Sequence, residues 1–199
     1  MRHAEQPVLV ASGGLTLRPW APSDAAAVLA AYTDPGIRHW HRRAVASEDE
    51  ARELIAGWNR GWVDETTACW AVLAGERADV AGRVAIRDVD LEIGQGKVGY
   101  WVLPAARGRG IAVRAVQEAS RWALAELGLH RLDLGHSVAN TASCRVAEKA
   151  GFRLEGTLRS ALLHTDGWHD MHLHGRTGQA RAEHQASRPI TGDRPAGVA

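Results

Sequence analysis

The sequence predicts an α+β (mixed α/β) domain whose mixed central sheet has about seven strands and about four flanking helices. Two patterns predict this class. Apolar segments separated by short polar turns form hairpins, which need antiparallel strands, whereas a strand, a helix and another strand in succession need a parallel pair. The chain has 199 residues, 45% of them hydrophobic, which suffices for one domain with a full core.

The domain is expected to span residues 15–177. Residues 1–14 carry charge and proline without apolar periodicity, so we expect a flexible leader there. Residues 178–199 are rich in Gly, Pro, Arg and Ala and also lack periodicity, so we expect a disordered tail.

The first part of the domain is expected to begin with a strand at Leu15–Pro19, where apolar and polar residues alternate. Residues 23–24, Ser and Asp, can cap a helix that runs to Tyr32, and the DPG triplet that follows indicates a turn. After a loop, a second helix begins at SEDE, in which Ser47 and Glu50 have the spacing of a capping box.

The middle of the chain contains three predicted strands before its main helix. Cys69–Ala74 and Val80–Val89 form a hairpin, and Val98–Leu103 follows. The helix after them has a stripe of apolar residues and ends at Gly128. The strand Arg131–Val138 comes next.

The last part of the domain is expected to hold a helix and a hairpin. Asn140 caps the helix, which ends at Ala150 before Gly151. The strands Phe152–Leu163 and Trp168–Gly175 are joined by the turn TDG.

Composition excludes several classes of protein. The formal net charge is +1, so no long-range field draws the chain to nucleic acid or to an anionic membrane. The two cysteines, Cys69 and Cys144, are far apart in sequence and are expected to be reduced thiols. The chain has no apolar run of the length of a signal peptide core or a membrane span, and we expect a cytoplasmic protein.

The stretch RGRGIAVRAV predicts a phosphate site at a helix N-terminus. The first N–H groups of a helix have no intrahelical partner, and the helix dipole places partial positive charge there. Gly108 and Gly110 leave room for a phosphate, and Arg107 and Arg109 add charge.

Two nucleotide-binding motifs fit this stretch poorly. A P-loop needs Lys and then Ser or Thr after its last glycine, but Ile111 and Ala112 stand there. A dinucleotide fingerprint needs a third glycine or an alanine at the correct offset, and this stretch does not have one there.

The run from Arg107 to Ala112 resembles the (Gln or Arg)-x-x-Gly-x-(Gly or Ala) acyl-CoA pyrophosphate loop of the Gcn5-related N-acetyltransferase (GNAT) superfamily. The blocks GYWVLPAARGRGIA, LGLHRLDLGHSVANTASCRVAEKAGF and LRSALLHTDGWHD resemble its ribosomal-protein-alanine acetyltransferase (RimJ/RimL-like) branch. The resemblance is strong over Val98–Asp170. Three collinear blocks are more specific than the loop motif alone.

The resemblance implies the GNAT acyl-CoA N-acyltransferase fold, in which Gly99–Leu103 splays from Arg131–Val138 after a bulge. The gap would admit the pantetheine arm of acetyl-CoA, which would pair with the strand near Trp101, Val102 and Leu103. The pyrophosphate would lie on the loop and helix start formed by Arg107, Gly108, Arg109, Gly110, Ile111 and Ala112.

The resemblance also implies catalytic roles. A backbone N–H near Val102 would bind the acetyl oxygen, Asn140 would contact the pantetheine amide, and Ser143 would supply a proton to the leaving sulfur. The alternative is that Asn140 only caps the helix and Ser143 is only a solvated residue of its first turn. Many relatives carry Glu where this chain has Lys97, so no general base is assigned.

Other clusters have simpler explanations. His164, His169, His172 and His174 have no acidic or thiol partner spaced with them, so we expect no metal. The resemblance implies that this hairpin lines the acceptor pocket, and the sequence alone does not decide whether the histidines face that pocket. RHWHRR at 38–43 is either a solvated basic loop or part of acceptor recognition.

The sequence therefore predicts an acetyl-CoA-dependent N-acetyltransferase in which the amine attacks the thioester directly, without metal, nucleic acid or membrane. The acceptor would be a protein N-terminus or a small-molecule or antibiotic amine. The alternative is a non-catalytic CoA- or acyl-CoA-binding regulatory module. A homodimer is compatible with the resemblance but has no mark in the sequence.

Overall fold

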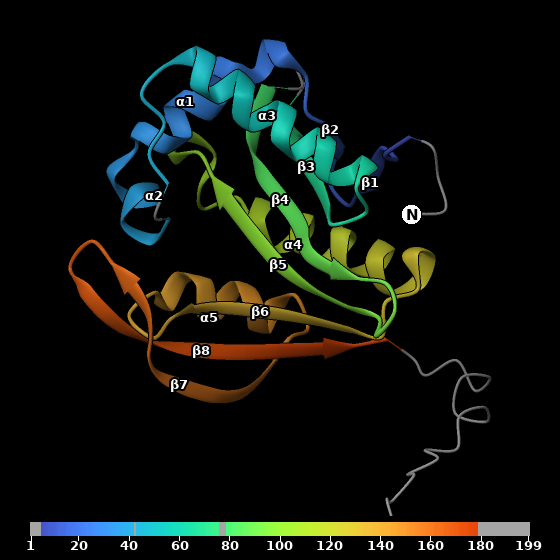
Figure 1. Ribbon diagram of the computed structural model, residues 1–199, viewed down its shortest axis with the longest axis vertical. Coiled ribbons are helices and arrows are strands. Elements are labelled where there is room, and N and C mark those ends of the chain that lie inside the picture. Colours follow the sequence, from blue (N-terminus) through green and yellow to red (C-terminus); the bar gives the residue numbers. More distant parts are fainter. Residues whose placement is uncertain (1–4, 42, 76–78, 179–199) are drawn as a thin grey trace, which may run out of the picture.

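The computed structural model describes residues 5–41, 43–75 and 79–178. An eight-stranded mixed sheet runs through this part of the chain in the order β1-β2-β3-β4-β5-β6-β8-β7 (Figure 1). Its strands are β1 Leu9–Ala11, β2 Leu15–Pro19, β3 Thr67–Ala74, β4 Asp79–Asp90, β5 Gln95–Val102, β6 Arg131–Ser137, β7 Arg153–His164 and β8 Gly167–Thr177. The α-helices are α1 Ala25–Thr33, α2 Pro35–Trp40, α3 Glu48–Val63, α4 Ile111–Trp122 and α5 Thr141–Lys149.

Two helices begin where their capping residues predict. The Ser47 hydroxyl accepts a hydrogen bond from the Glu50 N–H at 3.2 Å, and the Glu50 carboxylate accepts one from the Ala46 N–H at 2.8 Å. The Asn140 side chain accepts a hydrogen bond from the Ser143 N–H at 3.0 Å. These contacts satisfy N–H groups that the first helical turn leaves unpaired.

Two segments differ from the sequence prediction. Strand β1 pairs with β2 inside the expected flexible leader, so the sheet begins before residue 15. The expected loop after α1 contains helix α2, because Asp34 accepts a hydrogen bond from the Ile37 N–H at 2.9 Å and Pro35 occupies the first helical position. Residues 1–4 and 179–199, with most of the expected tail, lie outside the described residues.

The sheet has a hydrophobic core on each face. Helices α1 and α3 cover one face, and α4 and α5 lie on the other (Figure 1). Buried Trp20, Trp58 and Trp101 belong to the first core, and buried Trp70 and Trp122 belong to the second. No helix in the described ranges is both long and apolar enough to cross a membrane.

The parallel pair β5 and β6 separates along its length, as the resemblance implies (Figure 1). The two strands pair only from Gln95 with Arg131 to Lys97 with Asp133. On the other side of β5, the register with β4 shifts after Arg87, next to Asp88, whose φ is 50°. The separation opens a wedge in the sheet beyond Lys97.

Candidate active site

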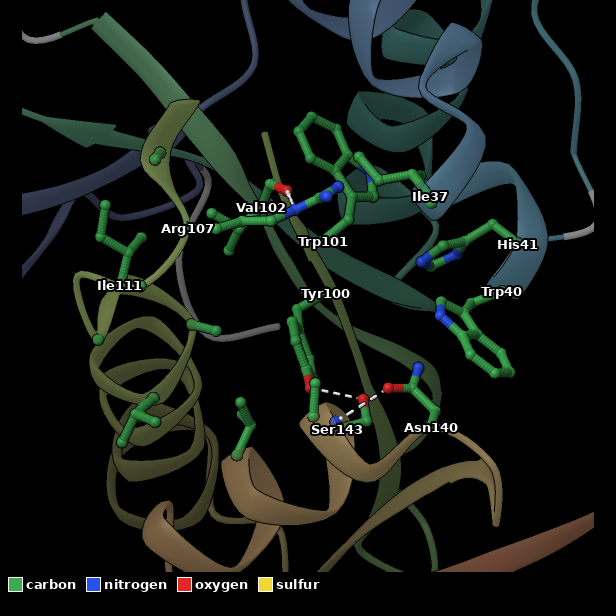
Figure 2. Close-up of a pocket in the computed structure, with 18 residues that line it drawn as sticks. Ile37, Trp40, His41, Tyr100, Trp101, Val102, Arg107, Ile111, Asn140 and Ser143 are labelled. Carbon is green, nitrogen blue, oxygen red and sulfur yellow. Dashed lines mark hydrogen bonds between the residues drawn. The ribbon is translucent and has the colours of Figure 1, made fainter. Parts of the chain in front are cut away.

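Two cavities meet at the wedge between β5 and β6. The α4-side cavity, of about 410 Å³, lies among α2, the start of α4 and the start of α5 (Figure 2). The β7-side cavity, of about 350 Å³, lies among β5, β6 and the β7–β8 hairpin. Both are lined by Trp40, His41, Tyr100, Asn140 and Ser143, which therefore form the junction.

The loop before α4 has the backbone conformation of an anion-binding site. Gly108 and Gly110 have φ of 75° and 69°, and Gly110 is the N-cap of α4. No heavy atom stands within 4 Å of the position that a Cβ would occupy at either glycine. The N-terminal amides of α4 therefore border open space in the α4-side cavity, as the sequence predicts.

Arg107 makes different contacts from those expected of it. Its Nη2 donates to Asp34 Oδ1 at 2.7 Å, and its Nε donates to the Val102 carbonyl at 3.2 Å. Burial opposes ionisation of Asp34, but the hydrogen bonds from Arg107 and Ile37 hold the pKa of this carboxyl below its usual value. Arg107 thus ties α2 to β5, while the Arg109 side chain is exposed.

Arg114, which sequence reasoning missed, holds the same loop from the first turn of α4. Its guanidinium donates to the carbonyls of Arg109 at 3.0 Å, Ser12 at 3.0 Å and Gly13 at 3.2 Å. The β1–β2 turn therefore buttresses the loop. The contacts of Arg114 with Ser12 and Gly13 could have been predicted only if strand β1 had been predicted first.

Strand β5 directs alternate backbone groups into the wedge. The Leu103 N–H donates to the Ala81 carbonyl at 2.9 Å. Backbone groups alternate in direction along a strand, so those of the odd-numbered residues here bond to β4. The backbone groups of Tyr100 and Val102 therefore face the open edge of β5. The Val102 N–H thus points to the junction. The Trp101 side chain, 3% exposed, packs on the opposite face against Trp20 and anchors the strand.

Tyr100 joins Ser143 at the junction. The two hydroxyl oxygens are 2.6 Å apart, and Asn140 caps the helix turn that carries Ser143 (Figure 2). Burial raises the pKa of Tyr100 to about 12, although the hydrogen bond with Ser143 opposes this shift. The phenol therefore stays protonated and can donate to Ser143. Sequence reasoning did not select Tyr100. Neighbouring side chains of a strand point to opposite faces, so the sequence could have indicated that Tyr100 lies on the face opposite Trp101.

Trp40 and His41 reach the same junction from the end of α2 (Figure 2). Burial, and then the positive charges of Arg83 and Arg87, lower the pKa of His41 to about 4, against a hydrogen bond with the Tyr100 backbone. His41 is therefore neutral near pH 7. Of the RHWHRR run, the structure thus places two residues at the candidate site and not in a solvated loop.

Lys97, Asp88 and Asp90 bond to one another or to the backbone of the β4–β5 turn. Lys97 lines the β7-side cavity, and its Nζ is 3.1 Å from Asp88 Oδ2. The Asp90 carboxylate accepts hydrogen bonds from the N–H groups of Glu92 and Ile93 at 2.9 and 3.0 Å, which stabilises the β4–β5 turn.

The C-terminal histidines divide into two groups. His164 and His169 have ring centroids 4.4 Å apart and pack near Trp40, and His169 also bonds to Ser137 at 2.7 Å and Asp166 at 3.0 Å. His164 and His172 line the β7-side cavity, which fits the expected acceptor side.

His172 and His174 meet His136 and Cys144. Sequence spacing gave these histidines no thiol partner, but α5 brings Cys144 close to them from a distant part of the sequence.

The sequence matches the family described as acetyltransferase (GNAT) domain over residues 14–153. A Bacillus subtilis (strain 168) protein named ribosomal N-acetyltransferase YdaF is 30% identical over 129 residues, which make up 63% of this chain and 68% of that protein.

Solved structures share the fold. RimL, a ribosomal L7/L12 alpha-N-protein acetyltransferase in complex with coenzyme A, gives a TM-score of 0.79 at 22% identity, covering 86% of this chain and 98% of that one. Mycobacterium smegmatis RimJ, in complex with CoA-disulfide, gives 0.77 at 23% identity and covers 86% of each chain.

Proposed function

Since the chain belongs to the GNAT acetyltransferase family, in its RimJ/RimL-like branch, and is an acetyl-CoA-dependent N-acetyltransferase, we propose that its α4-side cavity binds the coenzyme and its β7-side cavity binds the acceptor amine. The meeting of the two cavities at Tyr100 and Ser143 is the observation that carries this proposal. Two reactants held on opposite sides of one junction react as an intramolecular pair, which supplies much of the rate enhancement.

The residues that line the α4-side cavity support the placement of the coenzyme there. Amides at Gly108, Gly110, Ile111 and Ala112 would hold the pyrophosphate, with Arg109 free to add charge. The open edge of β5 at Tyr100 and Val102 would pair with pantetheine amides, and Trp101 and Leu103 would hold that edge in place by packing on the α1 and α3 side. Arg107 would act by holding the loop and α2 together.

The chemistry follows from the junction residues. The neutral amine nitrogen attacks the thioester carbon, the carbon–sulfur bond breaks, and an amide forms. The Val102 N–H would stabilise the carbonyl oxygen as it gains charge. Ser143 would donate its proton to the leaving thiolate and take one from Tyr100, which regains a proton from water. The attacking nitrogen would lose its extra proton to water as the amide forms, and Asn140 would hold the turn that positions Ser143.

The acceptor amine can lose its proton without a carboxylate as general base. Burial lowers the pKa of His41 most, and the positive charges of Arg83 and Arg87 lower it further. Both would act in the same direction on an ammonium at this junction. They would therefore favour the neutral, nucleophilic amine. The proton leaves to water, and no side chain need be the base.

We place a protein N-terminus first among acceptors. The relatives YdaF and RimL are named for ribosomal substrates, and RimL for an α-amino group. Arg87 and Lys97 lie on the wall of the β7-side cavity and, although Lys97 also pairs with Asp88 and Asp133 lies on the same wall, their charges would favour an acceptor with acidic groups beside its amine. Such a reaction would take place in the cytoplasm.

The test is release of free thiol from acetyl-CoA. Peptides with a free α-amine and acidic neighbours, the same peptides with blocked N-termini, and small primary amines are compared. We expect release only with unblocked amines, and most with the acidic peptides. Binding of CoA without release for any amine would support the non-catalytic regulatory module instead.

A further inference from the structure

Three imidazoles and one thiol converge on the α5 face of the sheet. The donor atoms of His136, Cys144, His172 and His174 all lie within 4.8 Å of one another. The four residues come from β6, α5 and β8, so only the tertiary structure assembles them.

The sheet register dictates the histidine part of the cluster. His136 lies opposite His172 in the antiparallel β6–β8 pair, and His174 follows two residues along the same strand. Residues two apart in a strand share a face, so all three rings point toward the same side. The Nε2 atoms of His136 and His174 are 3.1 Å apart.

Helix α5 supplies the fourth donor. Cys144 lies on its first turn and is half-buried, and its Sγ donates to Glu148 Oε1 at 3.7 Å one turn later. The thiol is free, so a metal can replace its proton. The Glu148 carboxylate adds negative charge beside the cluster, which suits a cation.

The distances and donor types fit one class of ion. Tetrahedral Zn²⁺ has bonds of about 2.0–2.3 Å, so its ligand atoms lie about 3.3–3.7 Å from one another. The donor atoms here need to move by about an ångström to reach that geometry. Imidazole and thiolate donors select Zn²⁺ and related thiophilic metals over Mg²⁺ or Ca²⁺.

Burial, the orientation of His136 and the buried Nδ1 atoms of His172 and His174, which have no hydrogen-bond partner among the described residues, support a ligand at this place. His174 is fully buried and His136 is 5% exposed. The His136 Nδ1 is already bonded to the Ser137 carbonyl at 2.8 Å, which leaves its Nε2 for the cluster. That arrangement, with one ring nitrogen held by a carbonyl and the other directed inward, is typical of metal-binding histidines.

We propose that His136, Cys144, His172 and His174 form a closed, structural Zn²⁺ site. Four protein donors leave no open coordination position, so the ion would tie α5 to β6 and β8 and take no part in acetyl transfer. It would brace the first turn of α5, which also carries Ser143, from the wall of the β7-side cavity, which His136 and His172 line. The assignment of the four donors does not depend on which acceptor the enzyme uses.

Cobalt is the probe, because tetrahedral Co²⁺ with a thiolate ligand has intense visible bands and an ultraviolet charge-transfer band. The full chain is stripped of metal with a chelator and titrated with Co²⁺ and then Zn²⁺. We expect the bands to saturate at one Co²⁺ per chain and to disappear as Zn²⁺ displaces it. A metal-free chain that develops neither band would overturn the proposal.

Variants identify the ligands. Cys144→Ser should abolish the charge-transfer band, and His172→Gln should weaken Co²⁺ binding by about tenfold or more. Cys69→Ala removes the other thiol, which is buried in β3, and His130→Gln removes an exposed histidine, so both should bind as the parent does. Circular dichroism and CoA binding verify that each variant is folded. A band that persists in folded Cys144→Ser would contradict the assignment.

Discussion

At the scale of single residues, the Tyr100–Ser143 hydrogen bond separates two interpretations of Ser143. A solvated first-turn serine would have water as its partner, whereas this hydroxyl lies 2.6 Å from a phenol held protonated by burial. A buried donor behind a hydroxyl makes it a better proton source, because it can replace the proton at once.

Replacing these hydroxyls should slow the chemical step. We expect Ser143→Ala to lower kcat by about 10²-fold or more, and Tyr100→Phe by about tenfold, since general acid catalysis contributes about 10²–10⁴-fold. Coenzyme affinity should change little in either variant. Steady-state kinetics and calorimetry with CoA measure both quantities.

Tyr32→Phe is the matched control, because Tyr32 is the other of the two tyrosines in the chain and packs against Trp101 outside both cavities. Its kcat should match that of the parent. An unchanged kcat in Ser143→Ala would contradict a catalytic role for Ser143 and leave it only a structural one.

At the scale of elements, helix α4 and its preceding loop depend on two left-handed glycines. Any other residue at Gly108 or Gly110 meets a backbone penalty of about 1–2 kcal/mol and places a side chain over the amides. Arg114 and the β1–β2 turn hold the loop in this conformation in advance. Preorganisation of this kind reduces the entropy lost on binding an anion.

The double variant Gly108→Val with Gly110→Val should therefore bind CoA at least about 10-fold more weakly, because bulky side chains block the amides that would meet the pyrophosphate. Titration calorimetry measures this. Gly128→Ala is the control, since Gly128 has φ of 85° and equally open surroundings but terminates the segment after α4. It should lose about 1–2 kcal/mol of stability, the penalty expected at one left-handed glycine, and keep its affinity. Equal affinity in the double variant and the parent would remove the loop from the coenzyme site.

At the scale of the whole molecule, burial of His41 at the junction links stability to pH. The pKa of His41 is about 4 in the folded chain and about 6.5 when unfolded, so between these values the unfolded chain binds more protons. Its contribution to stability is present above pH 6.5 and is lost as the pH falls toward 4. The shift corresponds to about 3 kcal/mol.

In His41→Gln, the free energy of unfolding should therefore fall less steeply between pH 6.5 and 4 than in the parent. Urea denaturation at several pH values gives the two slopes. His130→Gln, at an exposed position, should retain the slope of the parent. Parallel slopes for the parent and His41→Gln would show that His41 is protonated as readily in the folded chain as in the unfolded one.

Local sequence signals predicted much of this molecule. Capping residues such as Ser47 and Asn140, alternation along strands and the glycines at 108 and 110 act within a few residues, so they can be read in one dimension. The splay of β5 from β6 came from the resemblance and is confirmed by the short paired segment. The same short-range reasoning misjudged DPG as a turn, although Asp34 and Pro35 also have the pattern of a helix start.

The sequence by itself therefore determined most of the elements, the glycine-containing loop before α4 and the placement of Asn140 and Ser143 on one helical turn. Only the tertiary structure brought Tyr100 to Ser143, Asp34 to Arg107 and Cys144 to three histidines on neighbouring strands. The physical reason is that caps and turns depend on the spacing of a few neighbouring residues. Side chains from separate strands and helices meet only after the sheet has fixed its register and the helices have packed on it.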